Sequence, residues 1–205
     1  MEKDWTGNSR SHASTLGARN FALEERETND YYATNPESLK IFLERLKKDQ
    51  IKLSFNIWEC ACGEGHLSKV LKENGYMVLS TDLIDRGYGS VLDFLKYDGK
   101  YSGDILTNPP YKYAKEFVEH AINCILEGNY VIMFLKLQFL EGKARKLLFE
   151  KYPPKYVYVF SERQRCVMNG DFSKYNNKGD MHGAVAYCWY VWQKGFKGEP
   201  IIRWI

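Results

Sequence analysis

The sequence predicts an α/β fold, in which a mainly parallel sheet carries helices on both of its faces. Short apolar runs, which are typical of buried strands, alternate with longer segments of helical periodicity over most of the chain. Polar or glycine-containing residues follow several of these runs, at the strand ends where parallel sheets bind ligands. The length of 205 residues and the hydrophobic fraction of 44% suit one domain with a sizeable core.

An arm and a helix precede the first strand predicted for the sheet. Residues 1–29 are polar and mostly aperiodic, which predicts an extended or partly disordered arm before a single domain over residues 30–205. Asn35 suits a helix N-cap and Pro36 the first helical position. The apolar face of this helix consists of Leu39, Phe42, Leu43 and Leu46. The two tyrosines just ahead of the helix suit either the core or the lining of a pocket.

The best defined unit is a strand, a glycine-containing loop, a helix and a second strand that ends in an acid. The first strand covers residues 55–60 and the loop residues 61–66. After a helix ended by Gly75, the second strand covers residues 76–82 and ends at Asp82. Glycines let the backbone approach a ligand closely, and an acid at the tip of the second strand can bind ribose hydroxyls. The unit therefore predicts a nucleotide-type site.

Two details of this unit favour a cationic cofactor over a dinucleotide. The loop has the pattern Gly63-x-Gly65, without the third glycine of a dinucleotide fingerprint. Glu59 ends the first strand, and a carboxylate there is a poor neighbour for a pyrophosphate. S-adenosylmethionine, which carries an ammonium and a sulfonium group, suits this acid better than NAD does.

A second motif follows the strand predicted over residues 104–107. Neither proline of Asn108-Pro109-Pro110-Tyr111 has an N–H to donate, so the strand ends in a stiff elbow. The Asn108 amide and the Pro109 carbonyl are two acceptors beside the Tyr111 ring, an arrangement that suits an amino group on a planar substrate. By itself the motif also fits an ordinary strand-ending turn, because Asn-Pro dipeptides are common in turns.

Further elements complete the predicted sheet. A third strand near residue 90 precedes Asp93 and Phe94, an acid and an aromatic ring that could bind and cover an adenine. The remaining elements are a helix carrying Phe117 to Ile125 and ended by Gly128, a strand at 130–135, a basic helix at 139–152, strands at 155–160 and 184–192, and an edge strand at 201–205. The polar segment 161–183 is long for a loop in a compact domain, which makes it a candidate functional loop.

Charge, cysteines and hydropathy narrow the class of protein. Residues 136–205 contain 13 Lys and Arg against 6 Asp and Glu, a balance that suits a nucleic-acid-facing side as well as an ordinary solvated surface. The five scattered cysteines and four histidines lack metal-ligand spacing, so neither a disulfide framework nor a metal site is predicted. No apolar run has the length of a membrane span and no signal sequence is evident, so we expect a cytoplasmic protein.

With these motifs in this order, the chain resembles the class I S-adenosylmethionine-dependent methyltransferases that carry an Asn-Pro-Pro-Tyr motif. Over roughly residues 30–192 it is similar to DNA adenine-N6 methyltransferases, particularly the small phage- or prophage-borne ones. The resemblance implies a Rossmann-like fold with a mostly parallel seven-stranded sheet, an antiparallel C-terminal strand and helices on both faces. It also implies S-adenosyl-L-methionine as cofactor, S-adenosyl-L-homocysteine as its product, and methyl transfer to the N6 amino group of adenine in DNA.

The resemblance assigns roles to individual residues. Asn108, Pro109, Pro110 and Tyr111 are the expected catalytic residues, which would receive an adenine flipped out of the duplex. The residues expected to bind the cofactor are Tyr32, Thr34, Glu59, Ala61, Cys62, Gly63, Gly65, Asp82, Leu83, Asp93, Phe94 and Asn108. Tyr32 and Thr34 match the segment that binds the cofactor's carboxylate end. The match places Asp82 at the ribose, and Asp93 and Phe94 at the adenine of the cofactor.

The chain departs from the family in two respects. Cys60 stands where the family usually has proline, and only 94 residues follow Tyr111, too few for the usual separate target-recognition domain. Segment 161–183 is therefore the candidate nucleic-acid contact, unless it is only a flexible surface loop. The residues expected to engage nucleic acid there are Arg163, Arg165, Asn169, Phe172 and Lys174. A homodimer could supply further contacts.

Other functions also fit the motif. Protein glutamine methyltransferases and RNA-base methyltransferases share the Asn-Pro-Pro-Tyr motif, so the motif predicts methylation of a planar nitrogen more firmly than it predicts which one. A non-catalytic module that binds S-adenosylmethionine is a further alternative, although the tetrapeptide from Asn108 to Tyr111 is intact.

Overall fold

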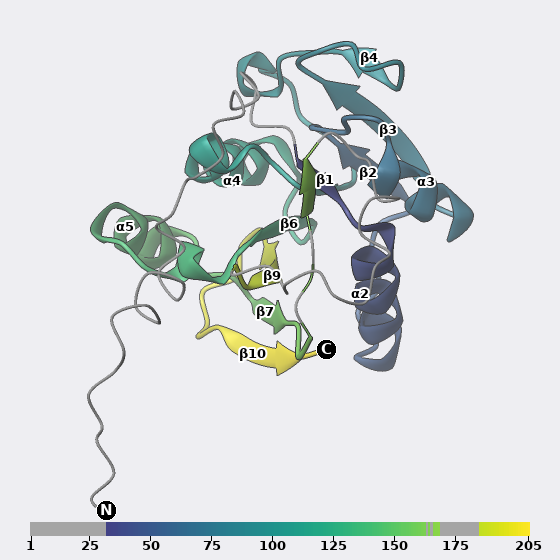
Figure 1. Ribbon diagram of the computed structural model, residues 1–205. Helices are drawn as coiled ribbons and strands as arrows, with labels where there is room; N and C mark the ends of the chain where they lie inside the picture. Colours follow the sequence, from purple (N-terminus) through teal and green to yellow (C-terminus); the bar gives the residue numbers. More distant parts are fainter. Residues whose placement is uncertain (1–31, 163, 165, 169–184) are drawn as a thin grey trace, which may run out of the picture.

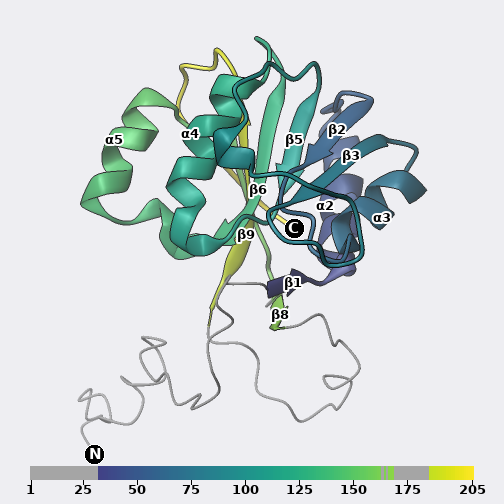
Figure 2. The same cartoon turned by 90° about the horizontal axis from the view of Figure 1, so that it is seen from above.

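The part of the chain that the structure describes folds into three layers, with a sheet between two pairs of helices (Figure 1). The computed structural model describes residues 32–162, 164, 166–168 and 185–205. Helices α2 (Pro36–Lys48) and α3 (His66–Glu73) cover one face of the sheet. Helices α4 (Ala114–Cys124) and α5 (Lys143–Lys151) lie on the other face (Figure 2). The predicted α/β fold is therefore confirmed.

The sheet is mostly parallel and has the strand order β10-β7-β9-β6-β5-β2-β3-β4. Its strands are β2 (Asn56–Glu59), β3 (Met77–Asp82), β4 (Ser90–Val91), β5 (Asp104–Thr107), β6 (Tyr130–Lys136), β7 (Tyr156–Val159), β9 (Tyr187–Gln193) and β10 (Ile201–Trp204). Among the described strands of this sheet, only β9 runs antiparallel to its neighbours, β6 and β7. This confirms the predicted antiparallel C-terminal strand. The carboxyl ends of β2, β3 and β5 therefore meet at one edge of the sheet.

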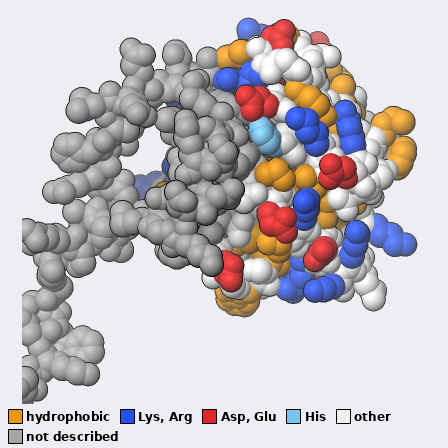
Figure 3. Space-filling view, turned by 45° about the vertical axis from the view of Figure 1, so that its right-hand side comes forward, with side chains coloured by type: hydrophobic (Ala, Val, Ile, Leu, Met, Phe, Trp, Pro, Cys, Tyr) orange, Lys and Arg blue, Asp and Glu red, His pale blue; other side chains and the backbone are white. Residues whose placement is uncertain are grey.

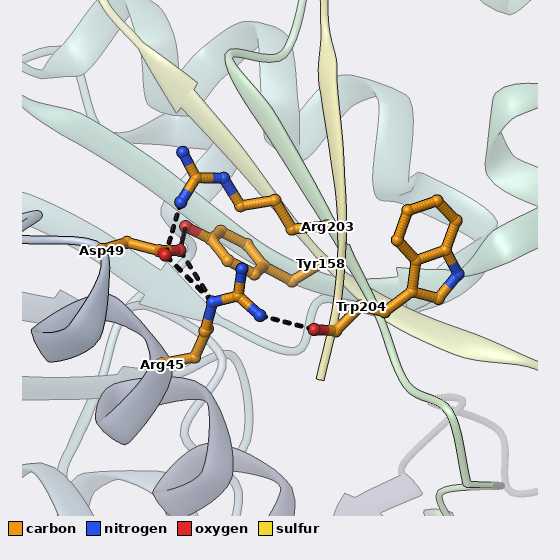
Figure 4. A network of polar contacts seen from close by, with 5 residues as sticks. All are labelled: Arg45, Asp49, Tyr158, Arg203 and Trp204. Atoms are coloured by element: carbon orange, nitrogen blue, oxygen red, sulfur yellow. Dashed lines mark hydrogen bonds and ion pairs between the residues drawn. The ribbon is translucent and has the colours of Figure 1, made fainter.

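The resemblance implied seven strands, whereas the described part of the sheet has eight, because β10, the edge strand predicted at 201–205, adds to the edge of β7 in parallel. A network around Asp49, just after α2, attaches β10 (Figure 4). The Asp49 carboxylate pairs with Arg203 and accepts a hydrogen bond of 2.7 Å from the Tyr158 hydroxyl. Arg45 donates both to Asp49 at 3.0 Å and to the backbone oxygen of Trp204 at 2.6 Å. The backbone pairing with β7 and these polar contacts hold the added strand, because about half or more of the surface of Ile201, Ile202 and Trp204 remains exposed.

Local sequence signals define α2 and the helix–sheet packing. The Asn35 side chain accepts a hydrogen bond from the Glu37 N–H at 3.0 Å, and Pro36 occupies the first helical position, as predicted. The predicted stripe of Leu39, Phe42, Leu43 and Leu46 is completely buried. These side chains pack against the sheet together with Trp189 of β9, whose ring stacks on Phe42. No helix among the described residues is long and apolar enough to span a membrane.

Two helix predictions were wrong in their extent. The basic segment predicted as one helix over 139–152 is a 3-10 turn, Leu137–Leu140, followed by α5. Gly142 separates the two with a φ of 118°, a backbone conformation outside any right-handed helix. Helix α4 ends at Cys124, and Gly128 makes the turn into β6 instead of ending that helix. Helical periodicity marks which residues are buried more firmly than it marks where a helix stops.

A short two-stranded ribbon was not predicted. Strand β1 (Tyr32–Thr34) pairs antiparallel with β8 (Cys166–Met168), with Thr34 opposite Cys166. The ribbon lies beyond one end of the large sheet, apart from its strands (Figure 2). The pairing joins the residues just before α2 to a segment more than a hundred positions later, a register that short, isolated strands do not specify by themselves. The N-terminal arm predicted over residues 1–29 lies outside the described residues.

Candidate functional site

A cavity of about 390 Å³ opens at the carboxyl ends of β2, β3 and β5. Its volume falls in the ordinary range of small-molecule sites, roughly 300–1,000 Å³. The predicted site residues that line it are Thr34, Glu59, Ala61, Cys62, Asp82, Leu83, Asp93, Phe94, Asn108, Pro109, Pro110 and Tyr111. Segments far apart in the sequence thus meet in one place, as the parallel-sheet argument predicts.

Asp82, at the end of β3, organises the glycine-containing loop. One carboxylate oxygen accepts a hydrogen bond of 2.8 Å from the Gly63 N–H, and the other accepts one of 3.1 Å from the Ile84 N–H. The loop is also tied to β3 by the Cys62 N–H, which donates to the Thr81 carbonyl at 2.9 Å. Asp82 therefore shapes the loop and lines the cavity at the same time.

Gly65 occupies the N-cap of α3 with a φ of 77°, a left-handed conformation that favours glycine. The ring of Tyr88 lies directly over it, and a Cβ on Gly65 would come within 2.3 Å of that ring. Lys72 donates a hydrogen bond of 3.0 Å to the Tyr88 hydroxyl, and the Lys69 ammonium lies 5.3 Å from the ring centre. Sequence reasoning missed Tyr88, although its place between Gly87 and Gly89 marks a tight turn.

Glu59 is a buried acid in the wall of the cavity, with only 2% of its surface exposed. The Ser68 hydroxyl donates to its carboxyl group, and Ser68 Oγ lies 2.6 Å from Ser80 Oγ. Burial raises the pKa of Glu59 to about 8; the Ser68 hydrogen bonds oppose this shift and the charge of Asp82 adds to it. A buried acid with this pKa loses its proton most readily when a cation binds beside it.

Asp93 and Phe94 lie at the cavity, but their side chains also have structural roles. Asp93 caps the 3-10 helix Phe94–Lys96 by accepting from the Leu95 N–H at 3.2 Å, and it pairs with Lys96 at 3.0 Å. Phe94 is buried, with its ring edge-on to Trp58 at 5.1 Å between centres. Leu83, by contrast, lines the cavity and is 60% exposed, so its side chain offers apolar surface to a ligand.

The Asn-Pro-Pro-Tyr elbow follows β5 as predicted. Asn108 donates a hydrogen bond of 2.8 Å from Nδ2 to Thr34 Oγ1 of β1. Tyr111 begins the 3-10 helix Tyr111–Tyr113 and is half-buried. The Lys136 ammonium lies 4.9 Å from the centre of its ring, and the ring of Tyr187 lies 5.9 Å from it. Lys136 and Tyr187 form a directly opposed pair on β6 and β9, and neither was predicted from the sequence.

Several predicted residues lie elsewhere or outside the described residues. Gly63 and Gly65 shape the loop without lining the cavity. Tyr32 begins β1, but its side chain is outside the described part of the structure. The residues predicted to engage nucleic acid, Arg163, Arg165, Asn169, Phe172 and Lys174, are also outside it. Among the residues that are described, no group of three or more His, Cys, Asp or Glu side chains could hold a metal ion.

The charge distribution can be followed on one face of the molecule. Lys and Arg side chains alternate there with Asp and Glu, and hydrophobic side chains lie between them (Figure 3). This face is on the side of α2 and α3, and the two signs of charge are mixed over the part of it that the structure describes.

Several crystal structures resemble this fold. A protein from Listeria monocytogenes assigned as a class I S-adenosylmethionine-dependent methyltransferase aligns over 87% of this chain and 66% of its own, with 12% identity and a TM-score of 0.57. The methyltransferase subunit of a type I restriction-modification system from Streptococcus thermophilus aligns over 86% of this chain and 48% of its own, with 15% identity and a TM-score of 0.59. A Pyrococcus horikoshii protein assigned as an RNA methyltransferase aligns over 77% of this chain and 83% of its own, with 11% identity and a TM-score of 0.50.

These similarities establish the architecture. No protein-family model matches the sequence, and no curated protein sequence matches it either. The chain spans less than two thirds of the Listeria protein and about half of the Streptococcus subunit. In this chain the fold comprises the mostly parallel sheet, the antiparallel strand β9 and the helices on both faces. The chain therefore has the Rossmann-like α/β fold of the class I S-adenosylmethionine-dependent methyltransferases, with an eighth strand at the edge of its sheet.

Proposed function

We propose that this protein is an S-adenosylmethionine-dependent methyltransferase that acts on the N6 amino group of adenine in DNA. One observation carries the proposal: the Asn108-to-Tyr111 elbow lines the same cavity as Glu59 and Asp82. The residues suited to a planar amino group thus adjoin the residues suited to a cationic nucleoside cofactor. The fold, which is that of the class I methyltransferases, supports this combination.

The cavity fits S-adenosylmethionine in its chemistry. The buried Glu59 carboxyl suits a cation, because a neighbouring positive charge stabilises its ionised form. Asp82 offers carboxylate oxygens to ribose hydroxyls, and the exposed side chain of Leu83 offers apolar surface to an adenine ring. The cofactor would supply an electrophilic methyl group: the bond from N6 to the methyl carbon would form as the bond from sulfur to that carbon breaks, the electron pair of the broken bond would remain on sulfur, and one N6 proton would be released to water.

The elbow can act on an amino group without a general base. The N6 lone pair of adenine is conjugated into the ring and is a weak nucleophile. Asn108 Oδ1 and the Pro109 carbonyl would accept hydrogen bonds from its two N–H groups. These hydrogen bonds would favour a tetrahedral nitrogen, which is more nucleophilic. Placed acceptors and proximity are recognised sources of rate enhancement. Tyr111 would stack on the adenine, which must first leave the duplex at a cost of a few kcal/mol.

DNA is the preferred substrate on two grounds. Residues 136–205 carry the basic excess of the chain, which suits a polyanionic partner. In addition, one protein of similar fold is the methyltransferase subunit of a restriction-modification system. RNA is the second candidate, because another protein of similar fold is assigned as an RNA methyltransferase.

A methyl-transfer assay with labelled cofactor tests the proposal. Purified protein is offered duplex DNA, single-stranded DNA, RNA and a protein mixture, and the modified DNA is sequenced by a method that detects N6-methyladenine. Transfer to adenine in DNA is the expected result. Transfer only to RNA or protein would leave the enzyme class standing and overturn the substrate, whereas no transfer to any substrate would overturn the function.

Two variants separate the roles of the elbow residues. Asn108→Ala should abolish methyl transfer while the dissociation constant of the cofactor changes by only a few-fold, since Glu59 and Asp82 remain. Tyr111→Ala should weaken DNA binding and slow the reaction, because stacking on an aromatic ring contributes about 1–3 kcal/mol per base. Near-normal turnover by Asn108→Ala would contradict the catalytic role of Asn108.

A further inference from the structure

The hydrogen bond between Thr34 and Asn108 links two segments separated by 74 positions in the sequence. Thr34 is 3% exposed and lines the cavity together with Asn108. The resemblance to known methyltransferases assigns Thr34 to the carboxylate end of the cofactor. In the structure its hydroxyl accepts a hydrogen bond from Asn108, the residue expected to contact the substrate.

An asparagine side chain has a donor end and an acceptor end, and the proposed reaction needs the acceptor. The N–H groups of the substrate amino group donate hydrogen bonds, so Asn108 must present Oδ1 to that group and keep Nδ2 away from it. The contact with Thr34 Oγ1 takes up Nδ2 at 2.8 Å. This hydrogen bond holds the amide at its nitrogen end. It therefore restrains the side-chain rotation that would move Oδ1 away from the substrate.

The backbone of Thr34 is held in place by the structure on either side of it in the sequence. Thr34 ends β1, where it pairs with Cys166 of β8. The next residue, Asn35, caps α2 through its own side chain. Thr34 therefore cannot shift without disturbing either the ribbon or the first turn of a buried helix. A hydroxyl on so constrained a backbone is suited to position another side chain.

We propose that Thr34 is a positioning residue, whose hydroxyl holds the Asn108 amide in the orientation that presents Oδ1 to the substrate amino group. This role rests on the proposed amino-methyltransferase function. It predicts that loss of the Thr34 hydroxyl slows the chemical step while leaving the affinity for the cofactor almost unchanged. A residue that binds the cofactor carboxylate would show the reverse pattern.

The test compares Thr34→Val, which keeps the shape and removes the hydroxyl, with Thr34→Ser, which keeps the hydroxyl. For each protein, kcat and KM are measured with the substrate that the wild type methylates. Calorimetry gives the dissociation constant of S-adenosylhomocysteine, and thermal denaturation gives the midpoint of unfolding. We expect Thr34→Val to lower kcat about 10-fold to 100-fold with the dissociation constant within about 3-fold of wild type. Thr34→Ser should recover most of the lost turnover.

Ser38→Ala is the matched control for loss of a buried hydroxyl in this region. Ser38 is completely buried in the first turn of α2, its hydroxyl donates to the Asn35 carbonyl at 2.7 Å, and it does not line the cavity. It should lower the unfolding midpoint without lowering kcat. An equal fall in kcat in Ser38→Ala would assign the effect of Thr34→Val to general loss of structure.

The other outcomes are equally decisive. Wild-type turnover in Thr34→Val would overturn the positioning role, and so would a loss of cofactor affinity large enough to account for the whole defect. If the wild-type protein methylates none of the substrates tested, the proposed function fails and the role of Thr34 fails with it. If the wild type is active and Thr34→Val has the same turnover, the role of Thr34 is overturned but the proposed function stands.

Discussion

The ammonium group of Lys136 lies over the ring of Tyr111, 4.9 Å from its centre. Tyr111 lines the cavity, whereas Lys136 is not among the residues that line it. Tyr187, opposite Lys136 on β9, places a second ring 5.9 Å from that of Tyr111. The last residue of β6 and the first residue of β9 together support the ring expected to receive the substrate base.

Lys136→Met should therefore lower kcat/KM with the wild-type substrate by about threefold to tenfold. The variant keeps the length of the side chain but loses an interaction worth roughly 0.5–1.5 kcal/mol, and Lys136→Arg should retain most of the activity because a guanidinium also packs on an aromatic face. Steady-state kinetics measure the effect. Lys151→Met removes a cation at the same distance, 4.9 Å, from the Tyr152 ring at the far end of α5, and serves as the control. Equal losses in both variants would show that net charge alone matters.

The contact between Gly65 and Tyr88 can be tested against a glycine of identical backbone conformation. Gly65 and Gly87 both have a φ of 77°, but a Cβ at Gly65 would meet the Tyr88 ring, whereas one at Gly87 would meet no atom within 4 Å beyond its own chain neighbours. Gly87→Ala should cost roughly 1–2 kcal/mol, the usual penalty of a left-handed alanine. Gly65→Ala should cost about 1–3 kcal/mol more, since the Tyr88 ring must be displaced. Urea denaturation of both variants measures the difference, and equal values would mean that Tyr88 moves aside without cost.

Glu59 should make the stability of the cofactor-free protein fall as pH rises. Burial raises the pKa of Glu59 from its ordinary 4.5 to about 8. Between these values the unfolded chain has lost this proton while the folded protein keeps it, so the stabilisation present below about pH 4.5 is lost progressively up to about pH 8. Glu59→Gln, which cannot ionise, should remove this contribution. Urea denaturation at pH 5.5, 7 and 8.5 tests the prediction, and parallel pH profiles for the two proteins would contradict it.

The Asp49 network predicts a role in stability without a role in catalysis. Arg203→Met removes a cation that is 27% exposed and pairs with an Asp49 side chain that is 9% exposed. We expect a loss of about 1–2 kcal/mol in the free energy of unfolding, because a largely buried ion pair is screened less than an exposed one. Lys146→Met, which breaks the exposed pair with Glu150 on α5, is the control and should cost less than about 0.5 kcal/mol.

The same network gives a pH test. Burial alone would raise the pKa of Asp49, but the hydrogen bonds from Tyr158, Arg45 and Arg203 outweigh it, and the pKa is lowered. The stabilisation is therefore present above the ordinary pKa of an aspartate and is lost as pH falls below it. The deficit of Arg203→Met should shrink in acid, and turnover at neutral pH should stay normal because none of these residues lines the cavity. A selective loss of turnover would contradict the separation of the two roles.

Much of the fold could be predicted because its signals are local. The alternation of apolar runs and helical stripes identifies the buried faces, and the Asn35-Pro36 pair marks the start of α2. The prolines after Thr107 end β5, and the glycines mark the turns after β2. Because the carboxyl ends of parallel strands gather at one edge, the cluster of Glu59, Asp82 and Asn108 also followed from the sequence.

Contacts between distant segments could not be predicted in the same way. The bond from Asn108 to Thr34 depends on the ribbon of β1 and β8, whose three-residue strands carry no pattern that specifies a partner. Tyr88 lies over Gly65 only because the turn after β3 folds back on α3. The sequence by itself determined the strands, the turns and the chemical character of the site. Only the tertiary structure decided which side chains meet there, because those partners are set by packing between elements and not by neighbours along the chain.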